Sequence, residues 1–445
     1  MKTPQKPSER RSRVLVASCL LLFCFLFTTG AGPILVDTEQ TGLGVSWQDR
    51  VVRYNPESGA EAGLGRLSNE ETLAILRSFF EEWQKLTLNG IAVANFSVVE
   101  GQGLGSVTPD NLKDHFSYCP PTETCPTEDP PFVLGSARTG QSPILFDTDG
   151  EITDLIHGEG AKESIIGFAG PRVIERVEGF LFITEGQAVL NGLFIDCPEG
   201  AKETDSCQDP EVTLEEFEGA IFHEIGHFIG LDHTQVNLSS AVKALSGDKS
   251  EVAGIPTMFP LLIDGKEQRS PHFDDIVSLA LLYPSSALGT SFCTLQGKVF
   301  QADGITELQG VNVVAKRGDN PLLEATSFVS GQLYVGSSEN CEAKEGDFTI
   351  KGLSPGVSYQ LEIEKISSAF TGGSSIEPCD PPQSGFQATS VPGTFACSSG
   401  GEVIITGTQT TTDIVTTKGT QKTTDSSPDA GGCALIPLTF HSFAL

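Results

Sequence analysis

The sequence predicts an α+β domain followed by an all-β sandwich. In residues 44–285, strand-like runs are separated by a small number of strongly amphipathic helical segments. Beyond Pro284, residues 290–400 change to alternating strand patterns that are broken by glycine turns. Residues 401–445 contain a threonine-rich stretch that is typical of an extended linker, followed by a short tail. The length of 445 residues is sufficient for two or three domains.

Two helices of the first domain begin at capping boxes, in which Ser or Thr is followed three residues later by Glu. Ser68 and Glu71 form one box, and apolar residues recur at helical spacing after it. Thr213 and Glu216 form the other box, which predicts a helix over residues 214–229. Strands are predicted at residues 47–55 and 91–100, and residues 180–195 contain two further strand-like runs. Residues 142–154 are expected to form a strand that runs into a turn.

Residues 1–31 are typical of an export signal, with a basic region, an apolar stretch over residues 14–27 and the small residues TTGAG. Cleavage is expected after Ala31. An uncleaved membrane anchor is the alternative, although the apolar stretch is short for a membrane span. We therefore expect a secreted, extracellular protein. The net charge of −30 argues against partners such as nucleic acid or an anionic membrane surface.

Export predicts that the cysteines form disulfides. Two close pairs are expected to bridge short loops, namely Cys119 with Cys125 and Cys197 with Cys207. Four further cysteines are expected to pair among themselves in an order that the sequence leaves open: Cys293, Cys341, Cys379 and Cys397. Cys433 is then the odd residue. A zinc–cysteine cluster is the rival interpretation, but the chain has no C-x-x-C motif.

The segment GAIFHEIGHFIGLDHTQ, residues 219–235, holds three of the seven histidines. On a helix, His223 and His227 lie one turn apart on the same face, a spacing that suits two ligands of one metal ion. Gly230 is expected to end the helix in a left-handed turn, after which the chain returns and brings His233 as the third ligand. Three protein ligands leave one position for water, as in catalytic zinc sites. A buried helix that happens to carry three histidines is the alternative.

Glu224 is the candidate catalytic residue. It follows His223 directly and points about a quarter turn away, so that it need not bind the metal. A carboxylate there is suited to take a proton from a metal-activated water and to pass it to the leaving amine of a peptide bond. Glu224 is therefore predicted to act as a general base.

A second metal site is predicted in the segment DTDGEITD. Asp147, Asp149 and Asp154 surround a glycine turn, and such an oxygen-rich pattern suits Ca²⁺. The pattern departs from an EF-hand because Gly150 stands at the wrong position. An ordinary solvated turn is the alternative.

HEIGHFIGLDH matches the full signature of the metzincin zinc metalloproteases. The segment IPTMFP, which contains Met258, resembles the methionine turn of that family. Pro260, two residues after the methionine, resembles the proline that matrixins have at this position. FDDIVSLALLYP, residues 273–284, is similar to the terminal helix of matrixins. The resemblance covers residues 44–285 and is closest to secreted bacterial matrixin-like enzymes. It implies a twisted mixed sheet with three main helices, Zn²⁺ on the three histidines, and endopeptidase activity on protein or peptide substrates.

Residues 290–400 resemble the regulatory-like β-sandwich found beside carboxypeptidases, through G-x-V, L-x-G-V-x-V-x-A and G-x-F-x-I-x-G-L-x-P-G patterns. The resemblance implies an accessory or substrate-tethering module, since these residues contain no metal or nucleophile constellation. The tail CALIPLTFHSFAL loosely resembles bacterial surface-sorting tails, which would attach the protein to a cell surface. A frayed C-terminus is the alternative.

Two other functions remain open from the sequence. One is a non-catalytic extracellular binding protein that retains a metzincin fold. The presence of all three histidines together with Glu224 counts against it. The other is a zinc enzyme that cleaves a substrate other than protein.

Overall fold

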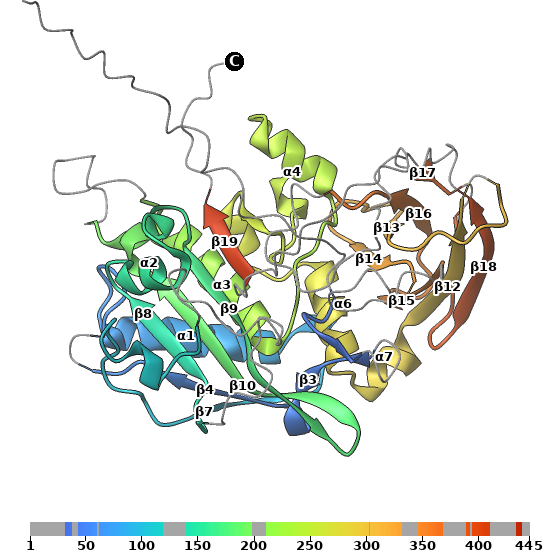
Figure 1. The fold of residues 1–445 in the computed structure, drawn as a ribbon. Coiled ribbons are helices and arrows are strands. Elements are labelled where there is room, and N and C mark those ends of the chain that lie inside the picture. Colours follow the sequence, from blue (N-terminus) through green and yellow to red (C-terminus); the bar gives the residue numbers. More distant parts are fainter. Residues whose placement is uncertain are drawn as a thin grey trace, which may run out of the picture.

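The computed structural model describes residues 32–37, 43–59, 62–118, 139–197, 211–301, 303–331, 346–367, 389–391, 394–409 and 433–437. The predicted export signal lies outside them. The chain forms a first part built on one large mixed sheet and a second part built on two smaller sheets (Figure 1). The predicted α+β class is confirmed. Within the described ranges, no helix is both long and apolar enough to cross a membrane.

The first part is built on a mixed sheet of eight strands. These are β3 (Ser46–Trp47), β4 (Val51–Pro56), β7 (Ser97–Glu100), β8 (Pro143–Asp147), β9 (Gly167–Val177), β10 (Phe180–Asn191), β11 (Leu261–Leu262) and β19 (Cys433–Pro437). Their order is β11-β19-β9-β10-β8-β4-β7, and β3 pairs with β10. β7, β4, β8 and β10 run parallel to one another, whereas β9 is antiparallel to β10. The β9–β10 turn has positive φ at Glu178 and Gly179, as a tight hairpin requires.

Helices and short hairpins complete this part. The helices are α1 (Asn69–Gln84), α2 (Glu151–His157), α3 (Leu214–Ile229), α4 (Leu238–Leu245), α5 (Gly265–Gln268), α6 (Phe273–Leu282) and α7 (Ser286–Ser291). The hairpins pair β1 (Val36–Asp37) with β2 (Leu43–Gly44), and β5 (Thr87–Leu88) with β6 (Ile91–Ala92). Both predicted capping boxes are present, at the starts of α1 and α3, and α3 has the predicted bounds.

α3 is the central helix of the first part, and nearly all of its surface beyond the first turn is buried. Trp83 of α1 stacks on Phe222 with ring centroids 4.9 Å apart, and its Nε1–H donates to the Phe222 carbonyl. Carbonyls in the last turn of a helix have no partner within it. Here Trp47 Nε1 donates to the Phe228 carbonyl at 2.9 Å and the Tyr283 hydroxyl to the Ile229 carbonyl at 2.6 Å. Long-range side chains therefore fix the helix that carries the histidines.

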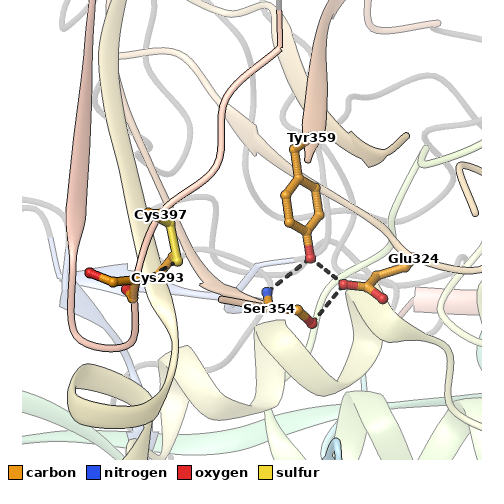
Figure 2. The surroundings of a disulfide bond; sticks show 6 residues. Cys293, Glu324, Ser354, Tyr359 and Cys397 are labelled. Atoms are coloured by element: carbon orange, nitrogen blue, oxygen red, sulfur yellow. Dashed lines mark hydrogen bonds between the residues drawn. A yellow bond between two sulfur atoms is a disulfide. The ribbon is translucent and has the colours of Figure 1, made fainter. Parts of the chain in front are cut away.

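The second part is a sandwich of a three-stranded and a four-stranded sheet with orders β15-β12-β18 and β14-β13-β16-β17. The strands are β12 (Cys293–Phe300), β13 (Asn312–Arg317), β14 (Ala325–Val329), β15 (Asp347–Leu353), β16 (Tyr359–Glu364), β17 (Thr389–Ser390) and β18 (Glu402–Gln409). Apolar side chains of both sheets share one core. Cys293 and Cys397 form a disulfide, and nearby the Tyr359 hydroxyl accepts from the Ser354 N–H and donates to Glu324 (Figure 2).

The two parts meet through buried polar contacts, and Asp274 of α6 is one of the residues that make them. Its Oδ1 accepts from the Thr326 hydroxyl at 2.8 Å and the Ser327 N–H at 2.9 Å, both on β14. Its Oδ2 accepts from the Thr234 hydroxyl at 2.7 Å. Complete burial raises the pKa of Asp274 to about 7. This carboxyl therefore joins the sandwich to the residue that follows His233.

Further contacts join the sandwich to the loop at residues 234–237, which follows His233. Gln235 exchanges two hydrogen bonds with the backbone of Ser367, and Asn237 donates to the Leu322 carbonyl at 2.9 Å. Val236 packs with Val314 of β13 and Ala325 of β14. The sandwich therefore contacts the loop that follows His233 at consecutive residues.

The structure differs from the sequence analysis in several local elements. The turn expected after residue 147 continues as α2, and residues 180–191 form one long strand in place of two shorter runs. β9 was not predicted. In the predicted linker and tail, residues 402–409 form β18 of the sandwich and residues 433–437 form β19 of the large sheet. These strands depend on partners that are remote in sequence, which a local pattern does not reveal.

Replacement of Asp274 by Ala is expected to lower the free energy of unfolding by at least about 2 kcal/mol, because the buried Ser327 N–H and Thr326 hydroxyl lose their acceptor. The matched control is Asp319→Ala, since the Asp319 side chain is 72% exposed on the same sandwich. Urea unfolding of both variants measures the effect. Equal stability of the Asp274 variant and the control would contradict the role given to this junction.

Candidate metal centre

The three predicted histidine ligands converge in the structure. His223 and His227 lie on α3, and His233 follows the turn at Gly230, whose φ of 114° is left-handed as predicted. Each of the three rings is at most 1% exposed. Nε2 of His233 lies 3.2 Å from Nε2 of His223 and 3.1 Å from Nε2 of His227. The three residues form a group that could hold one metal ion.

Backbone carbonyls orient two of the rings. Nδ1 of His223 lies 2.7 Å from the Thr257 carbonyl oxygen, and Nδ1 of His227 lies 2.7 Å from the Leu231 carbonyl oxygen. A carbonyl oxygen only accepts hydrogen bonds, so each Nδ1 carries the proton. In a neutral ring Nε2 then has a free lone pair, which is the form that binds a metal.

Electrostatics favours neutral rings and a cation between them. Burial lowers the pKa of His223 to about 4 and holds the pKa of His227 well below its usual value. Neighbouring nitrogen lone pairs at these separations repel one another unless a cation lies among them. Two ligands of a tetrahedral ion with bonds of about 2.0–2.1 Å would be about 3.3–3.4 Å apart. The observed 3.1 and 3.2 Å are close to that separation, so the donor set fits a small divalent metal ion.

A turn at Thr257 and Met258 contacts the residues of the candidate centre through its backbone. Asp275 of α6 accepts from the N–H of Thr257 at 3.0 Å and of Met258 at 3.1 Å. The same turn orients His223 through the Thr257 carbonyl, and the Met258 carbonyl accepts from the N–H of Thr234 at 2.8 Å. Burial raises the pKa of Asp275 to about 6, although its backbone donors favour the charged form. One carboxyl thus holds the turn that contacts both ends of the histidine segment.

Met258 packs directly on α3 between the first two ligands. A Cβ atom at Gly226 would lie 2.4 Å from the Met258 sulfur and 3.2 Å from Cζ2 of Trp83. Real Cβ atoms do not approach so closely, so a larger residue at position 226 would force the Met258 side chain to shift. Met258, which the sequence analysis singled out, therefore lies against α3 at the residue between His223 and His227 in the chain.

Glu224 is buried on α3 beside His223, with 1% of its surface exposed. Gly167, the first residue of β9, lies against it. A Cβ atom at Gly167 would be 3.0 Å from Cγ of Glu224. The Glu224 side chain therefore lies between α3 and the start of β9.

The predicted calcium ligands are not brought together. Asp147 accepts from the N–H groups of Ile152 and Thr153 and from the Thr153 hydroxyl, and so caps α2. Asp149 accepts from the Glu151 N–H, and Asp154 accepts from the Lys162 N–H and lies 3.8 Å from the Lys162 Nζ. The three aspartates do not form a metal-binding group among the described residues. The calcium expectation gains no support.

A second cluster, formed by Asp196, Cys197 and Glu211, has suitable spacing for a metal but unsuitable chemistry. Cys197 is disulfide-bonded, so its sulfur is not available as a thiolate ligand. The sequence analysis expects Cys197 to be bridged to Cys207, which lies outside the described residues. The Cys293–Cys397 disulfide settles one of the pairings that the sequence left open. The side chain of Cys433 and the residues Cys119, Cys125, Cys341 and Cys379 are not described.

Several residues that build the centre carried no role in the sequence analysis. Thr257 and Leu231 contribute only carbonyl oxygens, which any residue could supply, so no sequence signal marks them. Gly167 acts through close packing across the fold. Asp274 and Asp275 entered the sequence analysis only within the stretch that resembles the matrixin terminal helix. Two adjacent acids in an otherwise apolar helical stretch were the available signal.

Comparison with known proteins adds no relative. No family model matches the chain, and no curated protein matches it. The α+β fold and the buried three-histidine group are therefore the basis for assigning a function.

Substitution of His227 by Ala is expected to abolish stoichiometric binding of a divalent metal, because two imidazoles hold the ion much more weakly than three. His115→Ala is the control, since His115 lies apart from the group and bonds Gln141. Equilibrium dialysis against Zn²⁺, with metal content measured by mass spectrometry, distinguishes the two variants. Full occupancy in the His227 variant would refute the ligand assignment.

Gly226→Ala is expected to displace Met258 and to destabilise the protein by about 1–3 kcal/mol through overpacking, with weaker metal retention. Gly289→Ala in α7 is the matched control, because a Cβ there meets nothing within 4 Å. Thermal unfolding and metal content of both variants provide the measurement. If Gly226→Ala behaves like its control, the close packing of Met258 does not support the centre.

Proposed function

We propose that this chain is a secreted zinc-dependent endopeptidase of the matrixin-like metzincin type. The convergence of the His223, His227 and His233 Nε2 atoms, with Glu224 buried beside them, carries the proposal. The match of residues 223–233 to the metzincin signature supports the choice of zinc and of peptide hydrolysis. The packing of Met258 against Gly226, between two of the histidines on α3, supports the same family.

When bound by the three histidines, Zn²⁺ supplies Lewis acidity toward a water molecule and a substrate carbonyl. The carbonyls of Thr257 and Leu231 keep two of the rings oriented with Nε2 toward the ion. Glu224 takes the proton from the attacking water on its carboxylate and donates it to the amide nitrogen as the peptide bond breaks. Because Glu224 is nearly excluded from bulk water, its proton transfers are directed to groups within the site.

The proposed extracellular location rests on the N-terminal sequence and on a disulfide bond. The N-terminal pattern is typical of an export signal. The Cys293–Cys397 disulfide supports an oxidising compartment, where such bonds persist. Protein or peptide chains are the proposed substrates, and the sandwich is proposed as an accessory module that also steadies the loop after His233.

Glu224→Gln is expected to retain one zinc ion per chain while peptide hydrolysis falls by at least about 10²–10⁴-fold, because an amide cannot take the proton from water. Glu215→Gln, on the exposed first turn of the same helix, is the control and should keep the wild-type rate. Hydrolysis of a quenched-fluorescence peptide library, with zinc content measured in parallel, tests both. Loss of zinc from the Glu224 variant would make this residue a ligand or a structural element. Absence of hydrolysis in the wild type with zinc bound would favour a binding protein.

A further inference from the structure

The strand β19 lies in the large sheet of the first part, although residues 410–432 separate it in sequence from β18 of the sandwich (Figure 1). Residues 433–435 run antiparallel to residues 167–169 of β9. Residues 436–437 run parallel to residues 261–262 of β11. A single short strand therefore fills the gap between β9 and β11.

This gap adjoins the candidate metal centre on two sides. On one side, Leu435 is opposite Gly167, the residue that packs against Glu224. On the other side, Ile436 is opposite Leu261, which follows the turn containing Met258. β19 also contacts α3, the helix that carries Glu224 and two of the histidines. The strand thus runs past the general base on one side and the supporting turn on the other.

The backbone edges that face β19 require a partner. β10 pairs with the opposite edge of β9, and among the described strands β11 pairs only with β19. When β19 leaves, those N–H and C=O groups of residues 167–169 and 261–262 that point toward β19, and not toward the opposite edge, become free to bind another extended chain. Main-chain hydrogen bonds of this kind accept many sequences, so the gap suits an extended peptide of varied sequence.

We propose that residues 433–437 of this chain act as an intramolecular ligand of the gap between β9 and β11, and that they compete there with an extended peptide substrate. The identity of the competitor as a substrate rests on the function proposed above. The binding of a strand in this gap does not depend on it. The segment is an intramolecular ligand of the site that it covers.

Because residues 433–437 are covalently joined to the rest of the chain, they can occupy the gap even if their own affinity for it is weak. The threonine-rich composition of residues 410–432 is typical of a flexible linker, and such a linker of roughly 20 residues would give a local concentration on the order of 1 mM. A segment with an intrinsic dissociation constant of about 0.1 mM would then fill the gap about nine-tenths of the time. Release of the segment is therefore expected to increase the binding and cleavage of an extended peptide about tenfold.

The test uses the full chain with Ala434→Pro and Leu435→Pro together. Alternate residues of a strand point their N–H groups to opposite neighbours, and proline has none, so two consecutive prolines remove whichever N–H bonds β9. The matched control, Thr416→Pro with Thr417→Pro, places the same pair between β18 and β19. Both variants carry Glu224→Gln in the binding assay, which prevents cleavage of the probe.

The probe is a fluorescein-labelled peptide with the sequence of residues 429–441, with Ser in place of Cys433. By fluorescence anisotropy, it should bind the strand variant at least about tenfold more tightly than the linker control. Equal binding to both, or binding to neither, would overturn the proposal. With Glu224 restored, hydrolysis of a short peptide should rise in the strand variant alone. If the probe binds but neither protein cleaves any peptide, the proposed function fails and the strand site stands.

Hydrogen–deuterium exchange of the wild type gives a result that does not depend on folding of the variants. The amides of residues 433–436 should exchange at least about tenfold more slowly than those of residues 410–432. Addition of a competing peptide in excess should remove that protection. Unprotected amides at residues 433–436 in the wild type would overturn the proposal.

Discussion

The candidate centre depends on the hydrogen bond from Nδ1–H of His223 to the Thr257 carbonyl, which joins helix α3 to the turn at Thr257 and Met258. The other contacts around the centre hold these two segments in place. The hydrogen bond also fixes the tautomer of one ligand. Asp275 holds that turn through two backbone N–H groups, and Gly226 allows Met258 to pack on the helix. If the turn moves, the orientation of His223 and the position of Thr234 change together.

The adjacent carboxyls Asp274 and Asp275 divide the support of the centre between them. Asp275 holds the turn beneath the histidines, whereas Asp274 bonds Thr234 next to His233 and also Thr326 of the sandwich. The sandwich therefore has a physical connection to the third ligand, in addition to any role as a tether for substrate. Removal of the sandwich would leave a buried carboxyl without two of its donors and would uncover apolar residues of the loop.

Local signals predicted the parts of the site that depend on local structure. The capping box at Thr213, the helical spacing of His223 and His227, and the left-handed Gly230 each act within a few residues, and all are present. Sequence did not reveal β9, the packing of Gly167 on Glu224, or the placement of residues 433–437 in the large sheet. Those features depend on contacts between distant segments, where the pattern of one segment does not specify its partner. Export, zinc and peptide hydrolysis remain proposals that rest on motif and chemistry.

The central claim is that three imidazoles bind one metal ion, and X-ray absorption at the zinc edge tests it most directly. The account predicts one zinc per chain, three imidazole nitrogens at about 2.0–2.1 Å, and one further light ligand without sulfur. Sulfur in the coordination shell, or a spectrum with fewer than three imidazoles, would contradict it.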